Sequence, residues 1–146
     1  MKPNLSAALN VYLANIGVEY VKLHHLHWNV VGSQFKAVHE YLETLYDGLA
    51  NVLDATAEVL KINGQAPLSS MKGFLAVATI QELEGGEVEV PEALRTVLSD
   101  LELLKAQAKA IRAAAVQEDQ YDVVALMEGD LAQYSKTLWF LRATLR

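Results

Sequence analysis

The chain has 146 residues, of which 52% are hydrophobic, and this length predicts one domain, residues 1–146, with a sizeable buried core. It contains no Cys, which excludes disulfides, thiolate metal sites and thiol nucleophiles, so any metal must be bound by imidazole and carboxylate groups. Its 18 acidic and 12 basic residues give a net charge of −6, which argues against nucleic acid as an obligatory partner.

The first predicted helix lies near the N-terminus. The opening residues, MKPNLSAALN, lack the basic and long apolar regions of a signal peptide, and no apolar run approaches the roughly 18 residues of a membrane span. We therefore expect a cytoplasmic protein with no membrane partner. Asn4 is a candidate cap, and apolar residues recur at steps of three or four from Leu5 to Val30, which predicts a helix over this segment.

A second long helix follows a short break. Gly32 and Ser33 interrupt the first pattern, and Ser33 is a candidate cap for the next helix. No proline occurs from Gln34 to Asn63, and Gly64 provides a stop. The sequence therefore predicts one helix across this whole interval.

The remaining elements complete a helical bundle. Residues 69–80, SSMKGFLAVATI, predict a short helix within a connection. Pro91 favours the first turn of a third long helix that ends near Gln117, and a fourth follows the polar EDQYD and reaches Arg146. Four long helices with a short helix in the central crossover predict an all-α four-helix bundle.

Four polar residues of the second helix share one face. They are His39, Glu43, Asp54 and Glu58, spaced 4, 11 and 4 residues apart, and at about 100° per residue they fall within roughly 100° of arc. Glu43 and Asp54 are separated by about 16 Å along the helix axis. Ligands must lie within about 2.2 Å of a metal ion, so one chain cannot bring both pairs to one metal. Either there are two separate sites, or two chains build one.

A two-fold dimer could bring the two pairs of side chains to the same metal ion. If two copies of the helix pack antiparallel, the His39–Glu43 pair of one copy faces the second pair of the other, and symmetry creates two sites. The axis would pass near residue 48, which is Gly. Because glycine inside a helix costs about 1 kcal/mol relative to alanine, we expect Gly48 to mark a close approach of two helices at this axis. His27 would enter from the neighbouring helix.

Each of these residues also has an ordinary structural interpretation. His27 on an apolar stripe is typical of a core or interface histidine, and His39 with Glu43 at i, i+4 is typical of a surface pair. Only their combination on one face, with a geometry that closes around a two-fold axis, favours a metal site. His24 and His25 are expected on a solvated side, with an adventitious zinc site as the alternative.

The sequence resembles the Dps family of miniferritins over essentially its whole length. The family motif H-W-N-V-x-G-x-x-F-x-x-x-H matches residues 27–39, and D-x-x-A-E matches residues 54–58. The resemblance implies a ferritin-like bundle, a hollow dodecamer built from two-fold dimers, and a ferroxidase centre at each dimer interface. It also implies the iron ligands, which are His27 and His39 of one subunit with Asp54 and Glu58 of the other.

Several positions modify what the resemblance implies. Glu43 stands where the family usually has Asp, which puts the occupancy of the second iron position in question, and Val59 stands where Arg is common. Trp28 resembles the family's tryptophan beside the iron, which intercepts radicals, although a packed interface aromatic is the alternative. By the same resemblance, Asp122 or Asp130 is a candidate for a three-fold pore.

The predicted function is that of a ferroxidase and iron store that protects against oxidative stress. The ligand set suits two iron ions per centre, with zinc or manganese as competitors, and hydrogen peroxide is the expected oxidant. Bacterioferritin-type centres inside one bundle use Glu-x-x-His, which this chain lacks. The alternatives are a DNA-protecting structural protein of the nucleoid and a cage with a degenerate metal site. Direct DNA binding is not expected, because the ends of the chain are short and nearly uncharged.

Overall fold

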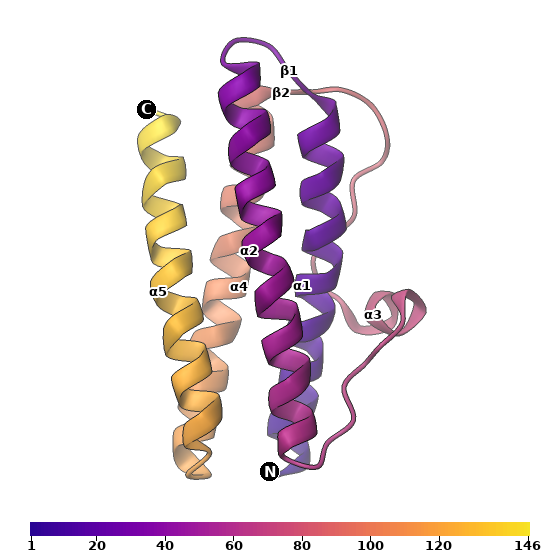
Figure 1. The fold of residues 1–146 in the computed structure, drawn as a ribbon, viewed down its shortest axis with the longest axis vertical. Helices are drawn as coiled ribbons and strands as arrows, with labels where there is room; N and C mark the ends of the chain where they lie inside the picture. Colours follow the sequence, from indigo (N-terminus) through magenta and orange to yellow (C-terminus); the bar gives the residue numbers. More distant parts are fainter.

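The computed structural model describes all 146 residues and shows four long helices packed side by side (Figure 1). In chain order the elements are α1 (Pro3–Asn29), β1 (Val30–Val31), α2 (Phe35–Ile62), α3 (Met71–Val77), β2 (Val88–Glu89), α4 (Val90–Gln117) and α5 (Tyr121–Thr144). The predicted all-α four-helix bundle with a short helix in the crossover is confirmed. No helix is both long enough and apolar enough to cross a membrane.

The long connection between α2 and α4 determines the direction of the helices. It runs the length of the bundle, so α2 and α4 point the same way while α1 and α5 point the opposite way (Figure 1). Its end is fixed by the parallel pairing of β1 with β2, which brings Val30 opposite Val88. This two-residue pairing was not predicted. It ties the end of α1 to the start of α4, beside the N-terminus of α2.

Two of the predicted helix caps are wrong. α1 begins at Pro3 with Lys2 as its cap, two residues earlier than a helix capped by Asn4 would begin. α2 begins at Phe35, and its cap is Gln34 in a left-handed conformation (φ 69°), with no side-chain hydrogen bond from Ser33. Pro91 does lie in the first turn of α4, as predicted.

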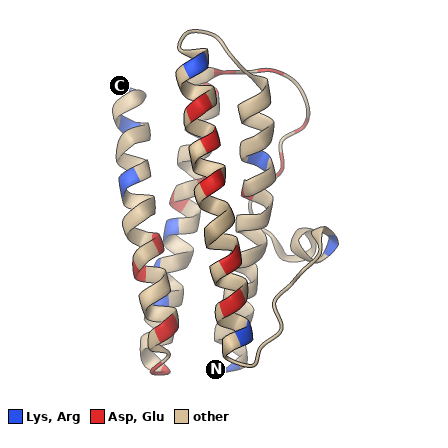
Figure 2. Cartoon of the chain, viewed as in Figure 1, with Lys and Arg blue, Asp and Glu red and all other residues tan.

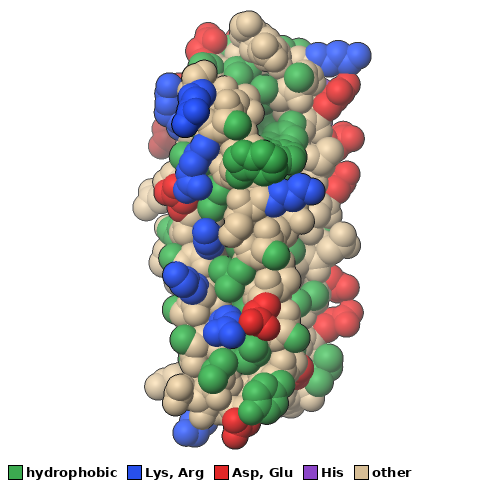
Figure 3. All heavy atoms as spheres, turned by 90° about the vertical axis from the view of Figure 1, so that its left-hand side faces the viewer, with side chains coloured by type: hydrophobic (Ala, Val, Ile, Leu, Met, Phe, Trp, Pro, Cys, Tyr) green, Lys and Arg blue, Asp and Glu red, His purple; other side chains and the backbone are tan.

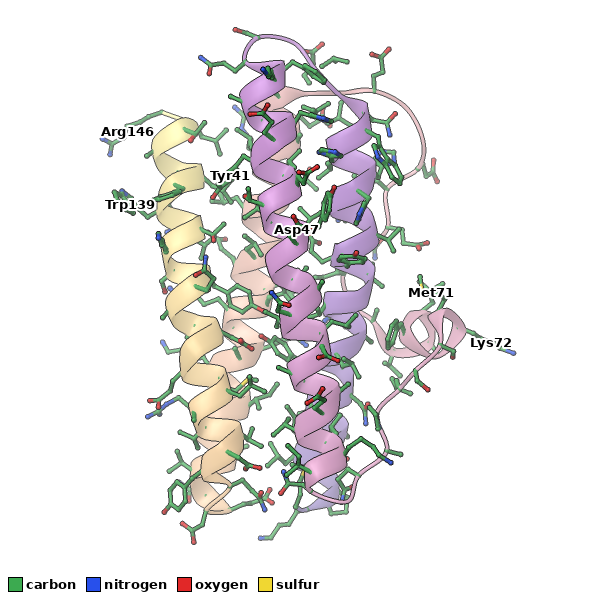
Figure 4. All side chains as sticks on the ribbon, in the orientation of Figure 1. Tyr41, Asp47, Met71, Lys72, Trp139 and Arg146 are labelled. Atoms are coloured by element: carbon green, nitrogen blue, oxygen red, sulfur yellow. The ribbon has the colours of Figure 1, made fainter.

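Several residues of α1 anchor the crossover, among them Asn10, Asn15 and Gly17. The side-chain oxygen of Asn15 accepts hydrogen bonds from the backbone N–H groups of Thr79 and Ile80, at 2.7 and 2.9 Å. Two residues further along α1, Gly17 lies directly under the ring of Phe74 in α3. These contacts hold α3 against the side of α1, while Met71 and Lys72 extend away from the bundle (Figure 4).

The bundle core contains buried polar groups among its apolar side chains. The hydroxyl of Tyr12 donates to Asp130 at 2.8 Å and lies 2.6 Å from the hydroxyl of Tyr134. Asp130 is only 7% exposed, so the suggestion that it lines a pore is wrong. Asp122 is exposed and accepts a hydrogen bond from the Asn63 side chain at 2.8 Å, so its role in a pore stays a prediction.

Candidate metal centre

The two motif histidines form a tight pair where α1 ends and α2 begins. The rings of His27 and His39 stack with their centroids 3.7 Å apart and their planes at 11°. Nδ1 of His27 lies 2.6 Å from the carbonyl oxygen of His39, and Nδ1 of His39 lies 2.7 Å from that of His27. Because a carbonyl oxygen can only accept, both Nδ1 atoms carry hydrogen and donate it. In the neutral rings, each Nε2 therefore has a free lone pair for a metal ion.

Glu43 reaches the same place from the next turn of α2. Its Oε1 lies 3.8 Å from Nε2 of His27, and its side chain is 55% exposed. Phe35 stacks against His39 with a centroid separation of 5.2 Å, so the imidazole pair has an apolar wall on that side. The structure thus brings the side chains of His27, His39 and Glu43 together, as the sequence predicted.

Asp54 and Glu58 lie on the same helix face but well apart from these three side chains. Both are exposed and form no hydrogen bond or ion pair within the chain. Figure 2 shows the acidic residues of α2 as a stripe along the helix, with a gap between an upper and a lower group. No three His, Asp or Glu side chains of the chain are placed to hold one metal ion. The side chains of one chain alone therefore do not form a complete metal centre.

Gly48 does not lie on the face that carries these ligands. It borders a cavity of about 100 Å³ between α2 and α5, together with Leu45, Leu49 and Tyr134. At 100° per residue it is rotated by roughly 130° from the middle of the ligand face. The predicted marker of a two-fold axis at Gly48 is therefore wrong. The residues on the ligand face nearest the midpoint between the pairs are Ala50, which is half-buried, and Asp47, which is exposed on α2 (Figure 4).

The neighbouring histidines are not on a solvated side, contrary to the prediction. His24 is half-buried, stacks on Tyr46 of α2 at 3.7 Å, and its Nδ1 donates to the carbonyl oxygen of Tyr20 at 2.7 Å. His25 is also half-buried, and its Nε2 is enclosed without a hydrogen-bond partner. Neither is an exposed ligand for adventitious zinc.

Tyr46 is the residue near the site that the sequence analysis missed. Its hydroxyl donates to Oε1 of Glu43 at 3.3 Å, and its ring meets the edge of His27 at 5.4 Å. Partial burial, and then the Glu43 carboxylate, raise the pKa of Tyr46, so the hydroxyl keeps its proton and can donate at neutral pH. The available signal was its spacing, one helical turn beyond Glu43.

Trp28 lies beside this aromatic group rather than within it. Its side chain is 69% exposed, and its ring centroid is 5.4 Å from that of His24. A role at an interface or in intercepting radicals stays a prediction.

Comparisons with known proteins agree on the family. A model of the ferritin-like domain matches residues 6–146. The chain is 34% identical to antigen TpF1 of Treponema pallidum (strain Nichols), over 94% of this chain and 78% of that protein. It is 33% identical to the DNA protection during starvation protein of Brevibacillus brevis, over 97% of this chain and 94% of that protein.

Solved structures give the same result. The crystal structure of TpF1 superposes with a TM-score of 0.96 at 31% identity, covering 98% of this chain and 92% of that one. A Dps protein from Bacillus brevis gives 0.94 at 33% identity over the whole of both chains. A Dps protein from Vibrio cholerae O1, described as a member of a broad superfamily of ferritin-like diiron-carboxylate proteins, gives 0.94 at 28% identity over 98% and 89%. The chain belongs to the ferritin-like family and, within it, to the Dps miniferritins.

Proposed function

We propose that the protein is a ferroxidase and iron-storage miniferritin with a di-iron centre between two subunits. One subunit supplies His27, His39 and Glu43, and the other supplies Asp54 and Glu58. The observation that carries the proposal is the imidazole pair, because both Nδ1 atoms are held by carbonyl groups and both Nε2 atoms are free for a metal. Membership of the Dps family supports iron storage and protection in the broad sense.

The donor set fits iron. Two neutral imidazoles and three carboxylates are borderline-to-hard ligands that bind Fe(II), with Zn(II) and Mn(II) as competitors. Carboxylates also stabilise the ferric product through their charge. The exposed carboxylates of Asp54 and Glu58 are not used within the chain, which leaves them free for the partner's half-site.

The substrates of the reaction are Fe(II) and hydrogen peroxide. Two Fe(II) ions each give one electron to the same peroxide, which takes up two protons and leaves as two molecules of water. Because both electrons arrive together, no hydroxyl radical is released. The ligands of the chain hold both ions in place and balance their charge. Ferric ions then hydrolyse and are stored as mineral inside a hollow dodecamer.

The test is an anaerobic addition of Fe(II) followed by half an equivalent of peroxide, while ferric absorbance and trapped hydroxyl radical are measured. We expect rapid oxidation at one peroxide per two irons, with little radical. Asp54→Asn should slow the oxidation at least about ten-fold, because even the loss of a residue that only supports a metal ligand reduces activity about ten-fold or more. The matched control is Glu40→Gln, an exposed acid of α2 whose only partner is Lys36, at 3.9 Å. Oxidation no faster than in buffer would contradict the proposal.

A further inference from the structure

We propose that Tyr46 is a positioning residue that holds the Glu43 carboxylate over the imidazole pair, and that it thereby sets the occupancy of the second metal position. The inference rests on the proposed function of the site. It is carried by the contacts of Tyr46, which connect Glu43 to α1 through a single side chain.

The Tyr46 ring is held in place from three directions. His24 stacks on its face at 3.7 Å with the planes at 22°. Tyr20 meets it edge to face at 6.1 Å, and His27 does so at 5.4 Å. His24 is itself fixed, because its Nδ1 donates to the backbone carbonyl of Tyr20 at 2.7 Å. These contacts leave the phenol ring little freedom to rotate, so the position of its hydroxyl group is restricted.

That position is beside the carboxylate of Glu43. The hydroxyl of Tyr46 lies 3.3 Å from Oε1 of Glu43, and the same oxygen lies 3.8 Å from Nε2 of His27. One carboxylate oxygen is thus shared between the candidate ligand and the tyrosine. The second oxygen of Glu43 makes no hydrogen bond within the chain and is free to bind a metal ion.

Glu43 needs this restraint more than an aspartate would. It has one more rotatable bond than Asp, and more than half of its side chain is exposed, so it samples more conformations when unbound. Binding a metal would freeze those conformations, and the lost entropy would weaken the site. A hydrogen bond from a fixed phenol restricts the carboxylate beforehand. His24 supports the tyrosine ring and is not a ligand in this arrangement.

The first experiment is an anaerobic Co(II) titration of the assembled protein, followed by visible absorbance. We expect two Co(II) per subunit, bound with different affinities. Tyr46→Phe keeps the stacked ring but removes the hydroxyl, and it should weaken the second binding step about five-fold, as expected for loss of one hydrogen bond. The first step should stay unchanged. Tyr20→Phe is the matched control, because the Tyr20 hydroxyl makes no hydrogen bond in the structure.

A second variant separates positioning from general loosening of the fold. Asp at position 43 is too short to reach the tyrosine hydroxyl in this geometry, so Tyr46→Phe should have no effect on Co(II) binding in a Glu43→Asp background. An equal loss in both backgrounds would overturn the positioning role. So would identical Co(II) affinities of Tyr46→Phe and the wild-type protein.

The outcomes also distinguish this inference from the proposed function. If the wild-type protein binds fewer than two Co(II) per subunit, or if Asp54→Asn leaves both steps unchanged, the inter-subunit centre itself is wrong. If both Co(II) binding steps depend on Asp54 but Tyr46→Phe changes neither, the inter-subunit centre is supported and only the proposed role of Tyr46 is wrong.

Discussion

At the residue scale, the most unusual group outside the candidate metal centre is Glu19, which is fully buried in the middle of α1. Neither of its carboxyl oxygens lies in hydrogen-bonding geometry with a donor or acceptor. Burial raises the pKa of Glu19 well above its ordinary value, the adjacent Asp100 raises it further, and Lys22 acts in the opposite direction. Lys22 pairs instead with Asp100, at 2.8 Å. Glu19 is therefore protonated in the folded protein at pH values where it would ionise in the unfolded chain.

This predicts a stability that falls as the pH rises. A carboxyl whose pKa is raised by folding binds more protons in the folded state, so its contribution is fully present below the unfolded pKa and is lost as the pH rises through the folded pKa. Glu19→Gln keeps the shape and removes the titration. In urea unfolding, the variant should gain stability over wild type as the pH is raised from 5 to 8, while Glu40→Gln should not. Equal pH dependence of Glu19→Gln and wild type would show that Glu19 is not a buried neutral acid.

Sequence reasoning reached some residues of the site and not others, for physical reasons. His27 and His39 belong to a motif with many fixed identities, so their type and spacing identify them without coordinates. The tautomers of the two rings could not be predicted, because each is set by a carbonyl of the other helix. His24 was misplaced and Tyr46 was missed, because stacking between helices leaves no pattern along one chain. Asp130 was misplaced because the resemblance indicated only the region that supplies pore acids, whereas in the structure this carboxylate is buried and accepts a hydrogen bond from Tyr12.

At the element scale, helix periodicity and the turn residues predicted the long helices, the crossover and both ends of α4, but not the caps of α1 and α2. The start of α2 depends on Gln34 adopting a left-handed backbone, which is uncommon for a residue other than glycine, asparagine or aspartate. The pairing of β1 with β2 joins residues that are distant along the chain, and strands of two residues are too short to give a period. Gly48 could have been placed correctly, because the helical repeat alone puts it off the ligand face.

The contact between α1 and α3 gives a prediction at the same scale. A Cβ atom on Gly17 would lie 2.6 Å from Cδ2 of Phe74, so Gly17→Ala should displace the α3 ring. Alanine is favoured over glycine inside a helix by up to about 1 kcal/mol, and Gly129→Ala in α5, where a Cβ meets nothing within 4 Å, should gain part of this. We expect Gly129→Ala to raise the melting temperature, whereas Gly17→Ala should not.

Hydrogen exchange would localise the effect of Gly17→Ala. Amides of Met71–Val77 should exchange faster in this variant than in the wild type or in Gly129→Ala, because Phe74 is the main apolar contact that holds α3 to α1. Unchanged exchange in α3 would mean that Phe74 can move aside without loosening the helix.

At the scale of the whole molecule, α2 carries mostly acidic residues, whereas α4 and α5 carry acidic and basic residues together. The acids of α2 form one stripe, and the basic residues of the C-terminal half lie on α4 and α5, where Figure 3 shows them spread over one face among apolar side chains. Two of these basic groups are already paired, Arg112 with Glu128 at 3.0 Å and Arg142 with Glu102 at 2.9 Å. The basic face is therefore partly neutralised by its own neighbours.

This arrangement predicts weak or absent binding to DNA. Phosphate binding requires free, clustered cations and falls steeply with salt, and this chain has a net charge of −6. In a gel shift with double-stranded DNA at about 150 mM salt, we expect no retardation. Glu102→Gln combined with Glu128→Gln would release both arginines and should produce retardation that disappears as salt is added. Retardation of the wild-type protein under the same conditions would instead show that the α4–α5 face binds phosphate despite its ion pairs, and the DNA-protecting alternative would then gain support.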